Sequence, residues 1–171
     1  MSNRIQTKKE KYSKRMEYMA EHPKVALLIH RINRIITYVV FGVYPLLLLW
    51  LLWNRDSALA DAIIIPLDAF LILTVFRYLV NRKRPYETYG VGPAIPKSTK
   101  GKSFPSRHVF SAFMIAMTYL FFFPYSWCGS CLLILGVILA VLRVVSGVHH
   151  VSDVIVGAVW GILAGVLYFI I

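Results

Sequence analysis

The last apolar stretch of the chain, Ser152–Ile171, reads SDVIVGAVWGILAGVLYFII, and after Asp153 it has no charged side chain. An α-helix needs about 20 such residues to cross the hydrocarbon core of a bilayer. The apolar residues run continuously rather than alternating with polar ones, and the stretch is too long for a typical strand. This stretch therefore predicts a transmembrane helix.

Four earlier segments are also predominantly apolar; they are Ile35–Trp53, Ala58–Val80, Val109–Tyr125 and Cys131–Val145. The composition agrees, because 58% of the 171 residues are hydrophobic and only 16% are charged. A soluble domain of this size rarely carries so little charge. We therefore expect an all-α, multi-span membrane bundle of five transmembrane helices, formed by residues 35–171 as one domain.

The N-terminal segment, residues 1–34, is strongly basic. Its Lys and Arg residues are Arg4, Lys8, Lys9, Lys11, Lys14, Arg15, Lys24, Arg31 and Arg34. Tyr12, Met16 and Met19 recur among them at helical spacing. This pattern is typical of an amphipathic helix that lies on an anionic membrane surface and ends near His22. A solvated basic tail is the alternative interpretation.

Charge and cysteine content narrow the classes of function. The formal net charge of +11 suits anionic headgroups or phosphate ligands, so membrane lipids are the expected partners. No nucleic-acid-binding motif is present in the sequence, which argues against DNA or RNA. Cys128 and Cys131 form a lone CxxC pair, which indicates small residues at a helix start rather than a metal or redox site.

Five spans would place the N-terminal segment, the loop 81–108 and the turn 143–152 on the same side of the membrane. The loop is polar and contains prolines and glycines along its whole length. Loops as long as this one in a compact domain are usually functional. We therefore expect the loop and the turn to build one site.

The second apolar segment ends in Arg77-Tyr-Leu-Val-Asn-Arg-Lys-Arg84-Pro85. Residues seven apart lie on the same face of a helix, so Arg77 and Arg84 are expected to point the same way. Pro85 disfavours helical geometry at the residue before it, which predicts the helix end there. Guanidinium groups donate paired hydrogen bonds to phosphate oxygens, although a basic helix end can also serve only as an interfacial anchor.

The third apolar segment opens with Phe104-Pro105-Ser106-Arg107-His108. The first turn of a helix presents unpaired backbone N–H groups and partial positive charge, which together suit a phosphate. Ser106 fits either an N-cap or a phosphate ligand. His108 is placed to give a proton to a departing oxygen, and a histidine that merely sits at the interface is the alternative.

The turn after the fourth segment reads Arg143-Val-Val-Ser-Gly-Val-His149-His150-Val-Ser-Asp153. His149 and Asp153 are four residues apart, which predicts that they share one helical turn. A carboxylate on one ring nitrogen fixes the tautomer and leaves the other nitrogen free to attack phosphorus. His150 has the poorer claim, because Val154 follows it at that spacing. The alternative is a helix-capping Asp beside two spectator histidines.

Together the three clusters resemble the signature of the type 2 phosphatidic acid phosphatase and vanadium haloperoxidase superfamily. The family pattern is Lys-x6-Arg-Pro, then Pro-Ser-Gly-His, then Ser-Arg-x5-His-x3-Asp. This chain has, in the same order and with the same spacings, Arg77-x6-Arg84-Pro85, Pro105-Ser106-Arg107-His108 and Leu142-Arg143-x5-His149-x3-Asp153.

The resemblance implies a membrane lipid phosphatase that needs neither a metal nor another cofactor. It implies His149 as the nucleophile, Asp153 as the group that orients it, and His108 as the acid that protonates the leaving alcohol and then activates water. The implied phosphate-binding residues are Arg77, Arg84, Ser106, Arg107 and Arg143. The implied substrates are phosphatidic acid, phosphatidylglycerophosphate or a polyprenyl diphosphate.

Three departures from the family pattern keep other functions open. Arg77 replaces a lysine, Leu142 replaces a serine, and Arg107 replaces the glycine that lets the family backbone approach the phosphate. A catalytically impaired lipid-binding membrane protein is therefore one alternative. A vanadate-dependent haloperoxidase is a weaker one, because those relatives are soluble.

We expect the protein in the cell membrane as a multi-pass protein. Its basic N-terminal segment favours a cytoplasmic active site under the positive-inside rule. The resemblance to bacterial relatives favours the opposite face, so the sequence leaves both orientations open.

Overall fold

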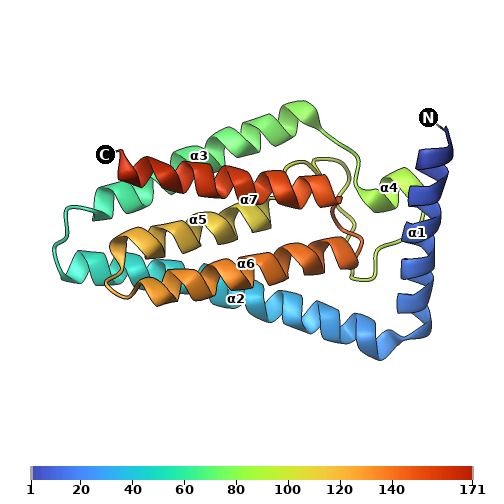
Figure 1. Cartoon of the computed structure of the whole chain (residues 1–171), viewed down its shortest axis with the longest axis horizontal. Helices are drawn as coiled ribbons and strands as arrows, with labels where there is room; N and C mark the ends of the chain where they lie inside the picture. Colours follow the sequence, from blue (N-terminus) through green and yellow to red (C-terminus); the bar gives the residue numbers. More distant parts are fainter. Residues whose placement is uncertain (1, 171) are drawn as a thin grey trace.

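The computed structural model describes residues 2–170. Met1, the start of the predicted N-terminal segment, and Ile171, the end of the predicted fifth span, lie outside the described residues. Within that range the chain is helical and contains no strand. Figure 1 shows the helices running side by side along the long axis, except α1, which crosses one end. The elements are α1 (Ser2–Glu21), α2 (Pro23–Trp53), α3 (Leu59–Val80), α4 (Pro85–Tyr89), α5 (Arg107–Phe122), α6 (Ser126–Val145), α7 (Val151–Val166) and the 3₁₀ turn η1 (Leu167–Phe169).

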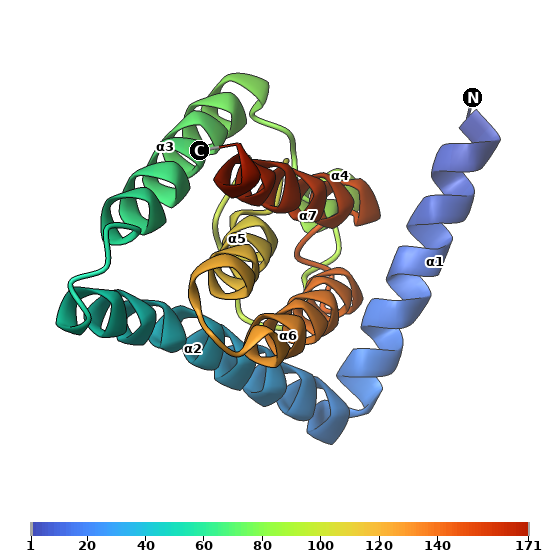
Figure 2. The ribbon, with the colours of Figure 1, turned by 60° about the vertical axis from the view of Figure 1, so that its left-hand side comes forward.

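Helix α5 forms the centre of the bundle, and α2, α3, α6 and α7 surround it (Figure 2). Every residue from Val109 to Tyr119 is buried, whereas an ordinary surface helix buries a single stripe. Phe110, which is 1% exposed, illustrates how fully the neighbouring helices cover α5. The centre of the fold therefore lies on the helix that begins at Ser106.

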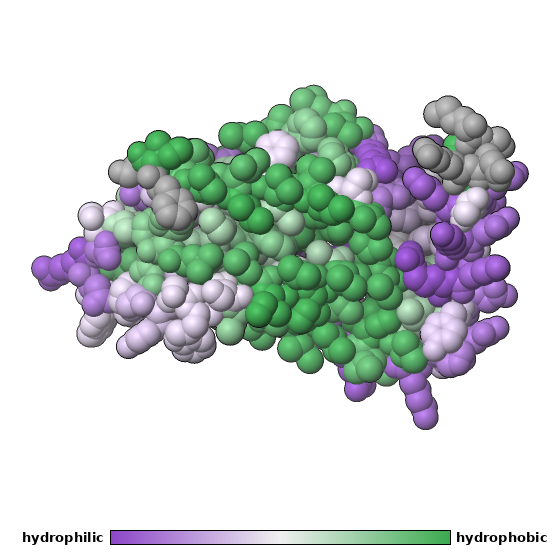
Figure 3. All heavy atoms as spheres, viewed as in Figure 1, coloured by the Kyte–Doolittle hydropathy of each residue, from purple (hydrophilic) through white to green (hydrophobic). Residues whose placement is uncertain are grey.

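The outer helices bury one stripe each and expose the rest of their apolar surface. Helix α2, for example, buries Ile36, Val40, Leu47 and Leu51 but exposes Leu46, Leu49 and Leu52. Figure 3 shows the result as a broad hydrophobic face along the bundle. Continuous apolar surface of this extent is stable in lipid rather than in water.

Among the described residues, three helical segments are long and apolar enough to cross a membrane: Pro23–Trp53, Leu59–Tyr89 and Ser126–Val145. Helices α5 and α7 are apolar but have 16 residues each, fewer than the roughly 20 that a full crossing needs. The all-α membrane bundle is confirmed, and the number of five spans stays a prediction.

Three glycines on α7 allow it to lie against α5 at close range. A Cβ at Gly157 would come within 2.7 Å of the Ser106 carbonyl oxygen, and one at Gly161 within 2.7 Å of the Phe110 carbonyl oxygen. A Cβ at Gly165 would meet Met117 at 2.3 Å. Small residues at this spacing are typical of closely packed membrane helices. The stripe therefore holds the start of α7 against the start of α5, where the candidate site lies.

Several helix boundaries differ from the sequence predictions: α5 ends at Phe122 rather than Tyr125, α7 ends at Val166, and two helices begin earlier than expected. Helix α2 begins at Pro23 and continues through residue 34 without a break, because proline is well tolerated in the first turn. Helix α6 begins at Ser126 rather than Cys131, so the preceding connection is shorter than expected. The predicted division into residues 1–34 and 35–171 stays a prediction.

Helix α1 is amphipathic, but its apolar face packs on the chain itself, and the predicted contact with an anionic membrane surface stays a prediction. Tyr12, Met16 and Met19 are all buried, while Lys9 and Lys14 are exposed. The helix ends at Glu21, and Pro23 starts the next one. In Figure 1 the loop between α3 and α5, the turn between α6 and α7, and α1 all gather at one end of the bundle. The predicted convergence of loop and turn is therefore confirmed.

Candidate active site

His149 and Asp153 lie together at the start of α7, but not for the reason that their spacing suggested. Helix α7 begins at Val151, so His149 lies outside it. Asp153 occupies the third helical position, and its carboxylate accepts a hydrogen bond of 3.0 Å from the backbone N–H of His150, the N-cap residue. This reciprocal cap folds the turn back onto the helix, so that His149 Nδ1 lies 3.4 Å from Asp153 Oδ2.

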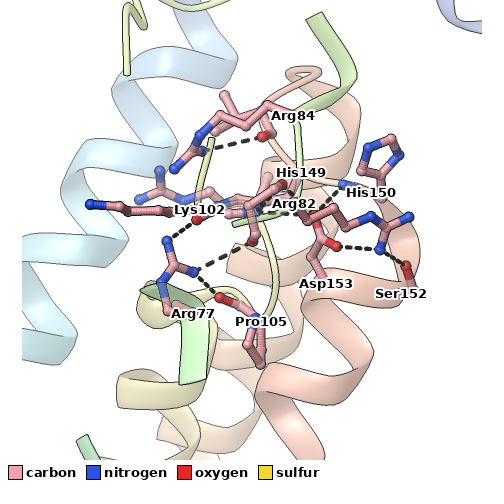
Figure 4. A network of polar contacts seen from close by, with 12 residues as sticks. Arg77, Arg82, Arg84, Lys102, Pro105, His149, His150, Ser152 and Asp153 are labelled. Atoms are coloured by element: carbon pink, nitrogen blue, oxygen red, sulfur yellow. Dashed lines mark hydrogen bonds and ion pairs between the residues drawn. The ribbon is translucent and has the colours of Figure 1, made fainter. Parts of the chain in front are cut away.

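The Asp153 carboxylate is fully buried and has several partners (Figure 4). Arg82 Nη1 donates to its Oδ1 at 2.8 Å and also donates to the Ser152 hydroxyl at 2.7 Å. The Ser103 hydroxyl donates to Oδ2 and lies 3.4 Å from His149 Nδ1. A buried charge is stable only when it is paired and hydrogen-bonded, so this network holds Asp153 ionised beside His149.

The imidazole of His149 is buried, with 4% of the residue exposed. Burial lowers the pKa of His149 to about 4, and the Asp153 hydrogen bond and the Asp153 charge partly oppose that shift. The ring is therefore neutral at pH 7. Because Nδ1 faces Asp153 and Ser103, the lone pair on Nε2 is the one left for nucleophilic attack.

Arg77 is buried, and it points into the loop that precedes α5. It donates to the backbone carbonyl oxygens of Lys102, Ser103 and Pro105 (Figure 4). A lysine, with its single ammonium group, has no planar fork to bridge these carbonyls. Arg77 thus orders the loop that carries Ser103, and its predicted contact with phosphate stays a prediction.

Arg84 reaches the site from outside α3, which corrects the prediction that it shares a helix face with Arg77. Helix α3 ends at Val80, because Asn81 adopts a left-handed conformation with φ 41° and ψ 41°. Arg84 Nε donates to the Gly101 carbonyl oxygen at 3.1 Å and Nη1 to the Val148 carbonyl oxygen at 3.4 Å. Burial lowers the pKa of the Arg84 guanidinium from its usual value, but such a strong base stays charged.

Ser106 and Arg143 supply donors that have no partner within residues 2–170. The Ser106 hydroxyl and Arg143 Nε have no hydrogen-bond partner among the described residues. Both residues are buried, since each is at most 5% exposed. Ser106 is the N-cap of α5 by position, yet its side chain makes no capping hydrogen bond. Its backbone N–H donates instead to the Asp153 carbonyl oxygen at 2.8 Å. Buried unpaired donors beside a helix N-terminus are the features of an anion site.

His108 is the second residue of α5 and lies within electrostatic reach of His149, Arg143 and Lys97. Its ring also lies against Phe41 of α2, with 6.1 Å between the ring centroids. The two motif histidines therefore belong to one electrostatic cluster, as the sequence predicted.

Arg107, the residue that replaces the family glycine, reaches the Phe70 ring of α3 and lies within electrostatic reach of His108. It is exposed, and its guanidinium carbon lies 5.9 Å from the centre of the Phe70 ring on α3. This distance suits a cation–π contact. The large side chain thus contacts α3, and its charge stays close to His108.

Sequence reasoning missed three residues of the site: Ser103, Arg82 and Lys97. Arg82 lies inside the basic run at the end of α3, and its position beside two other arginines was the available signal. The half-buried Lys97 lies near the charges of Arg84, Arg143 and Arg107, which together with burial lower the pKa of Lys97. Nothing in the spacing pointed to Ser103 or Lys97, because the loop brings them to the site by its path rather than by a periodic pattern.

Comparisons with known proteins agree with this geometry. The PAP2 superfamily model matches residues 57–171. Among solved structures, LpxE of Aquifex aeolicus is 24% identical with a TM-score of 0.69, covering 88% of each chain. A transmembrane PAP2 type phosphatidylglycerolphosphate phosphatase from Bacillus subtilis is 19% identical with a TM-score of 0.70, covering 98% of this chain and 85% of that one.

No curated protein matches the sequence significantly. At these identities the two solved structures establish the fold alone. The family model covers well over half of the chain and includes all three clusters of the candidate site. This protein therefore belongs to the PAP2 superfamily.

Proposed function

We propose that this protein is an integral-membrane phosphatase that removes phosphate from a lipid through a phosphohistidine intermediate. One observation carries the proposal: a neutral, buried His149, held by Asp153, lies in the same cluster as the unpaired donors of Ser106 and Arg143. A nucleophile with an orienting acid and adjacent anion donors is the arrangement that phosphoryl transfer requires.

In the proposed reaction, Nε2 of His149 attacks phosphorus and the bond between phosphorus and the lipid oxygen breaks. Binding of the anionic phosphate beside His108 favours the protonated ring, which gives its proton to that oxygen, so the alcohol leaves uncharged. His108 then takes a proton from water, which attacks the phosphohistidine. Inorganic phosphate is released and His149 returns to its starting form.

Charge that develops on the phosphoryl oxygens needs preorganised positive partners. Arg143, Ser106 and the first N–H groups of α5 are the proposed hydrogen-bond donors, with Arg84 beside them. Arg77 and Arg107 add positive potential from farther away. Because guanidinium groups fill this role, we propose that hydrolysis needs no metal, and activity should persist in excess EDTA.

A lipid substrate is supported by the position of the site at one end of an apolar bundle. One of the two similar solved structures is named a phosphatidylglycerolphosphate phosphatase, which makes that lipid a reasonable first substrate beside phosphatidic acid and a polyprenyl diphosphate. The pairing of the buried His149 with Asp153 supports retained catalysis over the alternative of an impaired lipid-binding protein.

The test is phosphate release by the purified protein from these three lipids in detergent, with and without EDTA. The proposal predicts turnover of at least one lipid by the wild type and none above background by the His149→Ala variant. Equal rates for the two proteins, or no release from any of the lipids, would refute it.

A further inference from the structure

A cavity lies between α1, α4 and the start of α7, with a volume of about 660 Å³. It is distinguished by its cationic lining, which comprises Lys8, Lys11, Arg15, Arg82 and Lys83. Among the described residues that line it there is no Asp or Glu. His149 and His150 form part of its inner wall, so it reaches the turn between α6 and α7, residues 146–150, which we call the catalytic turn. Such a lining is complementary to an anion.

The wall formed by α1 is fixed in place by specific contacts. The buried Tyr12 hydroxyl lies within hydrogen-bond distance of the carbonyl oxygens of Val91, at 3.2 Å, and Gly147, at 3.3 Å. Gly147 has φ +77°, and a Cβ there would come within 2.7 Å of the Tyr12 hydroxyl oxygen, so glycine is required. Helix α1 is therefore packed directly on the catalytic turn.

Arg15 presents an unpaired donor in this cavity. Its Nε is buried and has no hydrogen-bond partner within residues 2–170, and its guanidinium carbon lies 5.6 Å from the centre of the Tyr12 ring. Burial lowers the pKa of Arg15, but the guanidinium stays charged. The residue as a whole is half-buried and lines the cavity, so its charge is available to an anionic ligand there.

An apolar groove between α6 and α7 adjoins the cationic cavity. This groove has a volume of about 380 Å³, and the two share Val144 and Val151. Its remaining walls are aliphatic apart from Phe113. Figure 3 shows the junction as the place where the hydrophobic face of the bundle meets the hydrophilic surface of α1. A ligand that fits both parts is amphiphilic, with a charged head and an apolar chain.

We propose that this composite site binds an anionic phospholipid of the bilayer, with its phosphate among Lys8, Lys11 and Arg15 and one acyl chain along α6 and α7. The bound lipid is a resident phosphodiester rather than the substrate, because Ser106, His108 and Arg143 do not line the cavity. Through Tyr12 and His149 the lipid would brace the catalytic turn. The inference does not depend on the proposed hydrolysis.

The test uses native mass spectrometry of the full chain in a neutral detergent, with the dioleoyl forms of phosphatidylglycerol, phosphatidylcholine and phosphatidic acid as probes. The variant Lys8→Gln/Lys11→Gln loses two cations from the cavity. Its matched control, Lys9→Gln/Lys14→Gln, loses two exposed cations of the same helix that do not line it. Each basic residue contributes roughly 1 kcal/mol to binding at an anionic surface, so the first variant should bind phosphatidylglycerol about thirtyfold more weakly.

The expected result is one retained phosphatidylglycerol per chain, lost in the first variant and kept in the control, with phosphatidylcholine not retained by any of the proteins. If both double variants lost phosphatidylglycerol equally, general charge attraction would explain the binding, and the proposal would be overturned. Retention of phosphatidic acid in place of phosphatidylglycerol would also overturn it, because the cavity would then select the phosphomonoester substrate.

The apolar half has its own test. Ala158→Trp fills the groove between α6 and α7 and leaves the cations unchanged. It should weaken binding of dioleoyl phosphatidylglycerol at least fivefold while leaving a short-chain phosphatidylglycerol unaffected. Unchanged binding of the long-chain lipid by a folded variant would rule out the proposed acyl position.

Discussion

The two halves of the candidate site differ in how their polar groups are satisfied. In one half, Arg77, Arg82 and Arg84 already donate to backbone carbonyls or to Asp153. In the other half, the Ser106 hydroxyl and Arg143 Nε are unpaired within residues 2–170. The first half is therefore a scaffold that positions His149, and the second half is where an incoming phosphate would find donors.

The largest expected effect concerns the nucleophile itself. His149→Ala should lower kcat by about 10³-fold or more, because the covalent route is lost. His150→Ala is the matched control, since its ring contacts the Lys83 carbonyl oxygen, at 3.3 Å, and the Tyr89 ring, and the variant keeps the backbone N–H that donates to Asp153. Steady-state phosphate release measures both. A comparable loss of kcat in the two variants would contradict the assignment of His149 as the nucleophile.

The comparison of the two halves predicts different outcomes for two buried arginines. Arg143→Ala should lower kcat by roughly 10²-fold while changing thermal stability little, because it removes a donor to the transition state. Arg77→Lys should instead lower the melting temperature by roughly 3–5 °C, because three carbonyl oxygens lose their fork of donors. Thermal melts in detergent and kcat measurements on both variants check this. If Arg77→Lys instead lowered kcat and Arg143→Ala lowered the melting temperature, Arg77 would be the phosphate ligand.

Ser103 should have a smaller effect through the scaffold half. Ser103→Ala removes one hydrogen bond to Asp153 Oδ2 but leaves Arg82 and the His150 N–H in place. We expect about a tenfold loss of kcat with little change in KM. Ser103→Thr, which keeps the hydroxyl, should recover most of the activity. If the role of Ser103 were purely structural, kcat would fall alike in both variants.

Arg107→Gly should have a modest effect, because the Arg107 side chain lies over Phe70 at the edge of the site. We expect kcat to change less than threefold and any larger change to appear in KM for the lipid. Kinetics with one lipid phosphate separate the two parameters. A gain of 10²-fold or more in kcat would show that Arg107 impairs catalysis in the native chain.

The smallest expected change is in the protonation of His149 between pH 7 and pH 5.5. Because burial lowers the pKa of His149 to about 4, its ring is protonated only as the pH falls through about 4. Histidine-selective NMR in micelles, with His149→Ala assigning the signal, should therefore show a neutral ring throughout this range. Titration near pH 6.5 would place His149 in contact with water.

Much of this site was predictable from residue spacing, because its motifs are short and local. His108, His149 and Asp153 were all identified from the sequence, and the structure brings them to one end of the bundle. The reason for the His149–Asp153 contact was wrong, since a helix cap brings the two together rather than a helical turn. Spacing alone does not distinguish these geometries.

Long-range contacts were beyond the reach of the sequence. The seven-residue spacing of Arg77 and Arg84 suggested a common helix face, but Asn81 ends α3 before Arg84. Ser103 reaches Asp153 from a loop that Arg77 and the Arg82 carbonyl oxygen hold in place. The amphipathic pattern of α1 predicted its buried face, but not that Tyr12 would contact the catalytic turn.

The central claim is a covalent bond between phosphorus and His149. The most direct measurement is rapid denaturing quench of the enzyme with ³²P-labelled lipid phosphate, followed by alkaline peptide mapping. The account predicts an acid-labile, alkali-stable label on the peptide that contains His149, and none in the His149→Ala variant. Turnover without any trapped label, or a label on a different residue, would contradict it.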